Sequence, residues 1–233
     1  MDENYPWMWR MFYECINNKK EIMGMRKNTV FLYVFDTMAD WEVGYITAEL
    51  NSGRYYKKDI APTKIITVGK RRTPVTTMGG LKILPDIEVD AMKLEDTDAL
   101  ILPGGDTWAE SVHEPILKIA GKCLEKGIVV AGICGATVGL ARIGLLDSNC
   151  HTSNDLDYLK GICPVYKGEQ YYRQETAVTD GKLITASGIA PLEFSLLILK
   201  ALEVFSTETL DAWYKLYKTK EAKYYLKLID SIY

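Results

Sequence analysis

The chain has 233 residues, of which 48% are hydrophobic and 25% are charged. This length fits one large or two small domains, and the composition supplies a sizeable core, which excludes a disordered protein. A net charge of −3 argues against non-specific nucleic-acid binding, because that mode needs a basic face. We therefore expect no nucleic-acid partner.

From residue 29 onward, strand patterns alternate with helix patterns. The predicted strands cover residues 30–35, 64–68, 74–77, 81–84, 99–102, 127–134 and both arms of a hairpin over 178–183. The predicted helices cover residues 40–50, 114–125, 136–146, 191–205 and two segments within 207–233. Strands that alternate with helices predict an α/β, three-layer sandwich with a mostly parallel sheet and extra terminal helices.

Three segments differ in character along the chain. Residues 1–24 are rich in aromatic residues and methionine and lack a strand pattern. They are either an appended helix or an extension ahead of a domain that starts near Met25. Residues 25–205 form the α/β domain, and residues 206–233 are predicted to be a C-terminal helical extension of that same domain.

Cysteine and histidine usage limits the chemistry. The five cysteines are scattered without a CxxC pair: Cys15, Cys123, Cys134, Cys150 and Cys163. This spacing argues against a disulfide scaffold and a structural zinc site, so we expect no metal and no cofactor. Only His113 and His151 supply imidazoles.

Neither the N-terminal stretch nor the most apolar window has the pattern of a secretory signal or a membrane span. The first 20 residues start acidic and Arg10 interrupts their apolar stretch, which is untypical of a secretory signal. The apolar window 127–146 holds five glycines and Arg142, so we interpret it as a buried strand and helix, not a membrane span. We expect a cytoplasmic protein with free thiols and no membrane partner.

The most informative stretch runs from Val129 to Leu140, where a buried strand leads directly into a helix with Cys134 at the corner. The small residues Gly132 and Gly135 flank this cysteine, as a nucleophile elbow with strained backbone requires. An elbow would place Cys134 at the carboxyl edge of the sheet, where open α/β folds bind ligands. The alternative is a buried cysteine at a glycine-rich strand end.

Together with this elbow, further motifs in the same order resemble the ThiJ/PfpI superfamily, a class I glutamine-amidotransferase-like (flavodoxin-like) group. The matching motifs are Phe35-Asp36, Asp40-Trp41-Glu42, Leu102-Pro103-Gly104-Gly105, Gly144-Leu145-Leu146-Asp147, Thr185-Ala186-Ser187-Gly188 and Glu193-Phe194. The resemblance covers roughly residues 28–205. It implies that Glu42 pairs with Cys134 and that the N–H groups of Gly105 and Gly135 bind an oxyanion. Without it, Glu42 would be a first-turn carboxylate favoured by the helix dipole.

A reactive thiolate sets a requirement on Glu42. An ordinary thiol with a pKa of about 8.5 is only about 3% ionised at neutral pH. A helix N-terminus supplies at most about 2 kcal/mol, so the thiolate also needs a hydrogen bond, worth about 1.5–3 kcal/mol when charge-assisted. An ionised Glu42 would repel the thiolate and could not donate. We therefore predict a buried, neutral Glu42 that points at Cys134.

The family's hydrolases carry a histidine on the strand after the elbow helix, and residues 150–154 occupy that place here. An ungapped match puts Asn154 at the histidine position, whereas His151 would face away unless the strand is bulged. Both remain candidates for the substrate pocket. Trp108 either walls this pocket or packs in the core, and we expect His113 to be a surface residue.

Two functions are compatible with these residues. In the first, Cys134 attacks a small carbonyl, aldehyde or amide compound, as in an amidase or a glyoxalase. In the second, Cys134 is the oxidation-sensitive thiol of a stress protein without turnover, because the same donors stabilise oxidised sulfur. Whether the chain is an enzyme stays open at this point. The resemblance also implies a homodimer.

Overall fold

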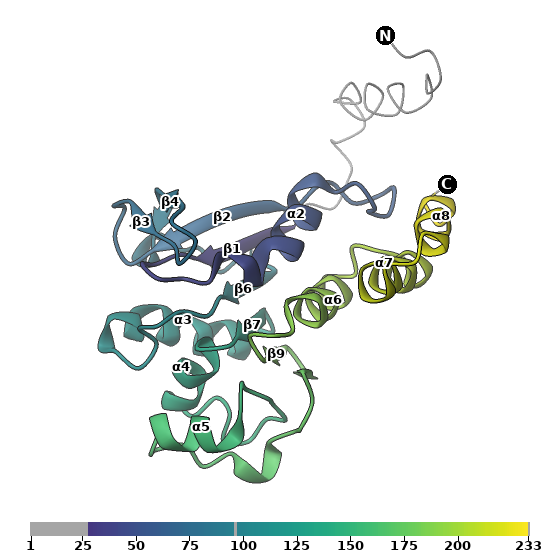
Figure 1. Cartoon of the computed structure of the whole chain (residues 1–233). Helices are drawn as coiled ribbons and strands as arrows, with labels where there is room; N and C mark the ends of the chain where they lie inside the picture. The colour runs from purple at the N-terminus through teal and green to yellow at the C-terminus, as the bar shows by residue number, and fades with distance from the viewer. Residues whose placement is uncertain (1–27, 96, 233) are drawn as a thin grey trace.

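The computed structural model describes residues 28–95 and 97–232. Its main feature is a seven-stranded sheet in the order β5-β2-β1-β6-β7-β9-β8 (Figure 1). In that order the strands are β5 (Ile87–Glu88), β2 (Lys64–Gly69), β1 (Thr29–Tyr33), β6 (Ala99–Leu102), β7 (Val129–Ile133), β9 (Leu183–Ala186) and β8 (Ala177–Asp180). Only the β8–β9 pair is antiparallel. The predicted α/β class with a mostly parallel sheet is therefore confirmed.

Helices cover both faces of this sheet (Figure 1). On one face lie α2 (Gly44–Ser52) and α6 (Pro191–Leu202), and on the other lie α3 (Glu114–Glu125) and α4 (Ala136–Arg142). Outside α6, α7 (Thr207–Thr219) packs against α8 (Lys223–Asp230). The three layers and the C-terminal helices follow the predicted arrangement, and residues 1–24 lie outside the described residues.

The central strands explain why the apolar runs lack alternation. β7 lies between β6 and β9, and all five of its residues are buried. A parallel strand that is covered by helices on both faces has no solvent side, so every position is apolar or small. The carboxyl ends of β1, β6 and β7 consequently share one edge of the sheet, which is where the predicted site residues follow.

Several local predictions need correction. The segment 40–50 begins as a 3-10 turn, η2 (Asp40–Val43), before α2 starts, and the helix predicted over 136–146 ends at Arg142. Residues 150–154 form no named strand, because only His151 makes an isolated bridge, to Tyr172. The helix predicted to reach residue 205 ends at Leu202, where Glu203 adopts a left-handed φ of 56°.

Both predicted hairpins are present. Strands β3 (Val75–Thr76) and β4 (Lys82–Ile83) pair as a separate antiparallel unit. The Asp180-Gly181 turn joins β8 to β9, with Gly181 at a φ of 57°. Short one-turn segments η3 (Val89–Ala91), η4 (Ser111–His113) and η5 (Glu169–Tyr171) link the remaining elements. Of the helices in the described part of the chain, none has both the length and the apolar character needed to cross a bilayer.

Candidate active site

Cys134 stands at the corner between β7 and α4 with a φ of 58°. Left-handed backbone is uncommon outside glycine, and its presence here fits the predicted elbow strain. The N–H of Cys134 donates to the carbonyl of Ala186 at 2.9 Å, so the β7–β9 ladder holds the corner in place. A methyl group on Gly135 would lie 2.7 Å from the carbonyl oxygen of Gly105. Position 135 therefore has to be glycine for the elbow to approach the 103–105 turn.

Glu42 is fully buried on η2. A backbone bond from Ala39 N–H to the Gly104 carbonyl, 2.9 Å long, attaches this segment to the turn after β6. The Gly104 N–H in turn donates to Glu42 Oε2 at 2.6 Å. The second carboxyl oxygen, Oε1, is buried and has no hydrogen-bond partner among the described residues. An orphaned buried oxygen is costly for an ionised carboxylate.

Cys134 and Glu42 face the same small space beside Gly188. A methyl group on Gly188 would lie 2.8 Å from Cys134 Sγ and 3.1 Å from Glu42 Oε1. A methyl group on Gly104 would lie 2.6 Å from Glu42 Oε2 and 2.7 Å from Cys134 Cβ. Two glycines thus leave the space in which the Cys134 thiol and the Glu42 carboxyl group lie side by side.

Electrostatics couples the two groups. Burial raises the pKa of the Glu42 carboxyl group, and hydrogen bonds with the Gly104 N–H and with Cys134 lower it by less. Burial also raises the pKa of the Cys134 thiol, Asn154 lowers it, and the Glu42 carboxylate raises it further. The contributions of Glu42 change sign once the carboxyl group keeps its proton, because it then donates to the sulfur. The effect of Glu42 on the pKa of the Cys134 thiol therefore depends on whether the carboxyl group holds its proton.

Asn154 supplies a fixed donor to the sulfur. Its Nδ2 donates to Cys134 Sγ at 3.3 Å, and its Oδ1 accepts from the Gly188 N–H at 2.8 Å and from the Ser187 hydroxyl at 3.5 Å. An amide flip would place an acceptor at the sulfur and a donor against the Gly188 N–H, so the network sets one orientation. The structure thus places the Asn154 side chain against Cys134.

Neither histidine of the chain reaches Cys134. His151 is fully buried, with Nδ1 bonded to the Asn149 carbonyl at 2.7 Å and Nε2 bonded to the Tyr166 hydroxyl at 2.7 Å. Its candidacy for the pocket is therefore wrong, because both ring nitrogens are used in the interior.

His113 and Trp108 pack together beneath the site. The expectation of a surface position for His113 is also wrong, because it is buried, bonds the hydroxyls of Tyr33 and Thr107, and stacks on Trp108. Burial lowers the pKa of His113 to about 4. Trp108 donates to the Pro103 carbonyl at 2.8 Å and packs under Gly135 and Gly139. It supports the elbow from the core and does not line the cavity.

A cavity of about 580 Å³ opens above Cys134. The residues that line it are Trp41, Glu42, Cys134, Asn154, Ser187, Gly188, Ile189 and Pro191. Trp41 and Ile189 stand at its mouth with 52% and 87% of their surface exposed. Beside it, the Gly105 N–H has no acceptor among the described residues, and the Gly135 N–H points at the sulfur and lowers the pKa of the thiol. A thiol, a buried carboxyl group and an amide side chain thus line one cavity, beside a backbone N–H that has no acceptor in the described chain.

Comparison with known proteins identifies the family of the chain. Residues 28–201 match the model of the DJ-1/PfpI family. The chain belongs to the DJ-1/PfpI family. It is 54% identical over 208 residues to a Bacillus subtilis protein named "Uncharacterized protease YoaZ", which covers 89% of this chain and 99% of the relative.

Two further members are informative. A thiJ/pfpI family protein from Bacillus anthracis has a crystal structure that is 56% identical, with a TM-score of 0.87, over 90% of this chain and 99% of the other. A Caenorhabditis elegans relative named "Glutathione-independent glyoxalase DJR-1.2" is 24% identical over 145 residues, 60% of this chain and 74% of its own length. Members of the DJ-1/PfpI family thus carry both protease and glyoxalase names.

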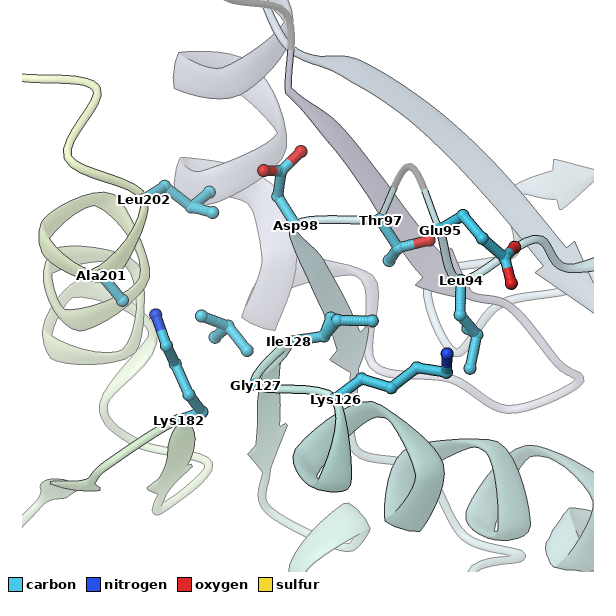
Figure 2. A pocket seen from close by; sticks show the side chains of 11 residues that line it. Leu94, Glu95, Thr97, Asp98, Lys126, Gly127, Ile128, Lys182, Ala201 and Leu202 are labelled. Atoms are coloured by element: carbon cyan, nitrogen blue, oxygen red, sulfur yellow. The ribbon is translucent and has the colours of Figure 1, made fainter.

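A second hollow lies at the opposite edge of the sheet in this DJ-1/PfpI member (Figure 2). It measures about 410 Å³ and lies at the amino ends of β6, β7 and β9, with Lys126 and Lys182 among its lining residues. No cysteine or histidine lines it. The candidate nucleophile, Cys134, lines the other cavity, at the carboxyl edge of the sheet.

Sequence reasoning missed Tyr158 and the contact of the Ser187-Gly188 segment with Asn154. Helix α5 (Leu156–Ile162) carries Tyr158, whose pKa is raised by burial and also by Cys134. The available signal was Asp155, which caps this helix through the Tyr158 N–H at 2.9 Å. The motif containing Ser187 and Gly188 was recognised, but its role in orienting Asn154 depends on a contact between distant segments.

Gly188→Ala should abolish most of the reactivity of Cys134 without unfolding the protein. The new methyl group would lie 2.8 Å from Sγ, closer than real contacts allow, and in a tight contact of 3.1 Å with Glu42 Oε1. Gly121→Ala on α3 is the matched control, because open space surrounds that position. Alkylation rates and circular dichroism of both variants check this. Unchanged Cys134 alkylation in Gly188→Ala would contradict the geometry.

Proposed function

We propose that this DJ-1/PfpI protein is a cysteine-dependent enzyme that acts on small carbonyl compounds, aldehydes above all, through Cys134. One observation carries the proposal: Cys134 stands on strained backbone beside a buried carboxyl group whose Oε1 has no other partner in the described chain. A proton on that oxygen would satisfy it and would stabilise a thiolate at the same time. Strain of this kind concentrates at functional sites.

The proposed step is hemithioacetal formation. The Cys134 sulfur attacks the carbonyl carbon, the π electrons move to the oxygen, and Glu42 Oε1 gives its proton to that oxygen and becomes a carboxylate. The N–H groups of Gly105 and Gly135 would hold the developing negative charge before the proton arrives, which is the role of an oxyanion hole. Every atom that gains or loses a bond in this step belongs to the substrate, to Cys134 or to Glu42.

Turnover of a 2-oxoaldehyde would then move the aldehyde hydrogen to the neighbouring carbon, which gives a thioester on Cys134. Water would hydrolyse this thioester to a 2-hydroxy acid and release the Cys134 thiol, with no external oxidant and with the proton returned to Glu42.

Aldehydes are favoured over amides by the position of the histidines. Expelling an amine from a tetrahedral adduct needs a proton donor for the leaving group, and both described imidazoles are buried in other hydrogen bonds. The glyoxalase name of the Caenorhabditis elegans relative fits aldehyde chemistry. The Bacillus subtilis relatives are named proteases, which implies amide chemistry, and the site of this chain suits that chemistry less well.

The second candidate is an oxidation sensor or stress protein. Neither histidine reaches Cys134, and this favours the sensor, because peroxide needs only a thiolate as its reaction partner. The sulfur would attack one peroxide oxygen to give a sulfenic acid, with water as the other product after proton transfer. Oxidation without any carbonyl turnover would select this candidate over the enzyme.

Turnover of methylglyoxal by the wild type and by Cys134→Ser tests the proposal. We expect consumption of the aldehyde by the wild type and none above background by Cys134→Ser, with Cys150→Ser as the control cysteine. Cys150 lies outside the cavity, where Arg173 Nη2 donates to its sulfur at 3.1 Å. Equal consumption by the wild type and Cys134→Ser would refute the enzyme.

The proposal places the protein in the cytoplasm as a homodimer. All four described cysteines are free thiols, which fits a reducing compartment. Exposed apolar residues on the β3–β4 hairpin and on α8, including Leu81 and Leu226, offer surface for a second copy. We expect light scattering at micromolar concentration to give twice the mass of one chain. A monomer under those conditions would contradict the dimer.

A further inference from the structure

We infer that the cavity over Cys134 selects uncharged carbonyl compounds with an apolar substituent and rejects those that carry a carboxylate or a phosphate. This inference rests on the proposed function, since it names the substrate class of the same nucleophile. The charge and the polarity of the cavity walls differ between the floor and the mouth.

The floor of the cavity holds acids but no cation. Its two ionisable lining residues are Glu42 and Cys134, so after loss of one proton the pair carries one negative charge. No lysine, arginine or histidine lines the cavity, and no cation is among the groups that shift the pKa of either residue. Nearby, Asp106 raises the pKa of Tyr158 and adds further negative charge. An anionic substrate would lose its hydration here without gaining a counter-ion.

The mouth of the cavity is apolar and open to solvent. Trp41 from η2 and Ile189 from the segment before α6 are the exposed walls, and Pro191 continues the apolar side. A substituent that covers the indole ring and the Ile189 side chain removes apolar surface from water on both partners. No carboxylate at the mouth offers a cationic substituent an ion pair, since Glu42 is buried at the floor. The substituent that fits is therefore neutral and apolar.

Cys150 provides an internal contrast. It is a half-buried thiol on the same chain, but its sulfur accepts a hydrogen bond from the Arg173 guanidinium at 3.1 Å. A negatively charged reagent that approaches Cys150 meets the Arg173 cation as well as the Asp180 carboxylate, whose Oδ2 accepts from the Cys150 N–H at 2.6 Å, whereas one that approaches Cys134 meets an acid pair and no lining cation. The preference for a neutral over an anionic reagent should therefore be stronger at Cys134 than at Cys150.

The test compares iodoacetamide with iodoacetate on the intact protein. Each reagent forms an S–C bond and releases iodide with the bonding electrons, and the two are close in size and differ in charge. Peptide mass spectrometry gives the rate at each cysteine, with free cysteine as the reference for intrinsic reactivity. We expect the iodoacetamide-to-iodoacetate rate ratio to be about tenfold higher or more at Cys134 than at Cys150.

Two variants test the walls separately. Ile189→Lys puts a cation at the exposed mouth and should raise the iodoacetate rate at Cys134 several-fold, while Leu226→Lys adds the same charge on α8 and should not. Trp41→Ala should lower the N-phenylmaleimide rate at Cys134 relative to the N-methylmaleimide rate. Equal rate ratios at Cys134 and Cys150, or no response to Ile189→Lys and Trp41→Ala, would overturn the inference and leave the proposed function intact. Failure of Cys134 to react with either haloacetyl reagent would overturn both.

Discussion

At pH 6, we expect Cys134 to be alkylated at least about 100-fold faster than the other cysteines of the chain. An ordinary thiol is only about 0.3% ionised at that pH. The Cys134 thiol would be largely ionised, because its thiolate form accepts hydrogen bonds from Glu42, Asn154 and Gly135. Cys123 and Cys163 are buried, and burial raises the pKa of Cys123 to about 11 and that of Cys163 in the same direction. Both thiols should remain protonated and shielded throughout.

Peptide mass spectrometry after brief treatment with iodoacetamide checks this expectation. Cys134 should also form sulfinic acid with mild peroxide, as expected for an accessible thiolate. Cys134→Ser serves as the control, because it should lose the fast phase and keep the slow one. Equal labelling of Cys134 and Cys150 would show that the elbow does not activate its cysteine.

Amide turnover by the wild type should be very weak or absent, and Asn154→His should increase it. Proton transfer by a positioned imidazole is worth about 10²–10⁴-fold, and Asn154 stands 3.3 Å from the sulfur, where an imidazole would assist a leaving amine. Asn154→Ala should weaken aldehyde binding, because it removes the amide donor, yet it should still permit oxidation of Cys134. Hemithioacetal chemistry needs no leaving group and should survive in Asn154→His.

Initial rates with a chromogenic amide and with methylglyoxal would separate these effects. His151→Ala is a useful comparison, because His151 bonds Tyr166 and Asn149 in the interior and should influence stability more than chemistry. Robust amide turnover by the wild type that disappears in both Cys134→Ser and His151→Ala would contradict the assignment of Asn154 and restore His151 as a base.

The sheet and the elbow were predictable because their signals are local. About a dozen neighbouring residues carry both signals. The continuous apolar run of β7 indicates burial, and the small residues around Cys134 indicate a strained backbone. The pairing of Cys134 with Glu42 came instead from the resemblance. Nothing local distinguishes Glu42 from an ordinary first-turn carboxylate, and its partners, Gly104 and Cys134, come from distant segments.

The histidines show where sequence reasoning fails. Polar residues in short connecting segments look exposed, but His113 on η4 is covered by Phe35 and Trp108, and the hydroxyl of Tyr33 on β1 bonds its ring. The segment 150–154 reads as a strand, yet only His151 forms a bridge, because the chain there runs beside Tyr172 and not along the main sheet. Side-chain direction in such irregular segments depends on long-range contacts that periodicity does not contain.

The proposed chemistry requires a proton on Glu42, and the direction in which the Cys134 titration shifts in two Glu42 variants tests whether that proton is present. We would follow thiolate absorbance against pH in the wild type, Glu42→Leu and Glu42→Gln, with Cys134→Ser as the blank. If Glu42 is a neutral donor, Glu42→Leu removes a bond to the thiolate and moves the Cys134 titration to higher pH, whereas Glu42→Gln keeps a donor and moves it little. If Glu42 is ionised, both variants remove a negative charge. A shift of both titrations to lower pH would therefore contradict the account.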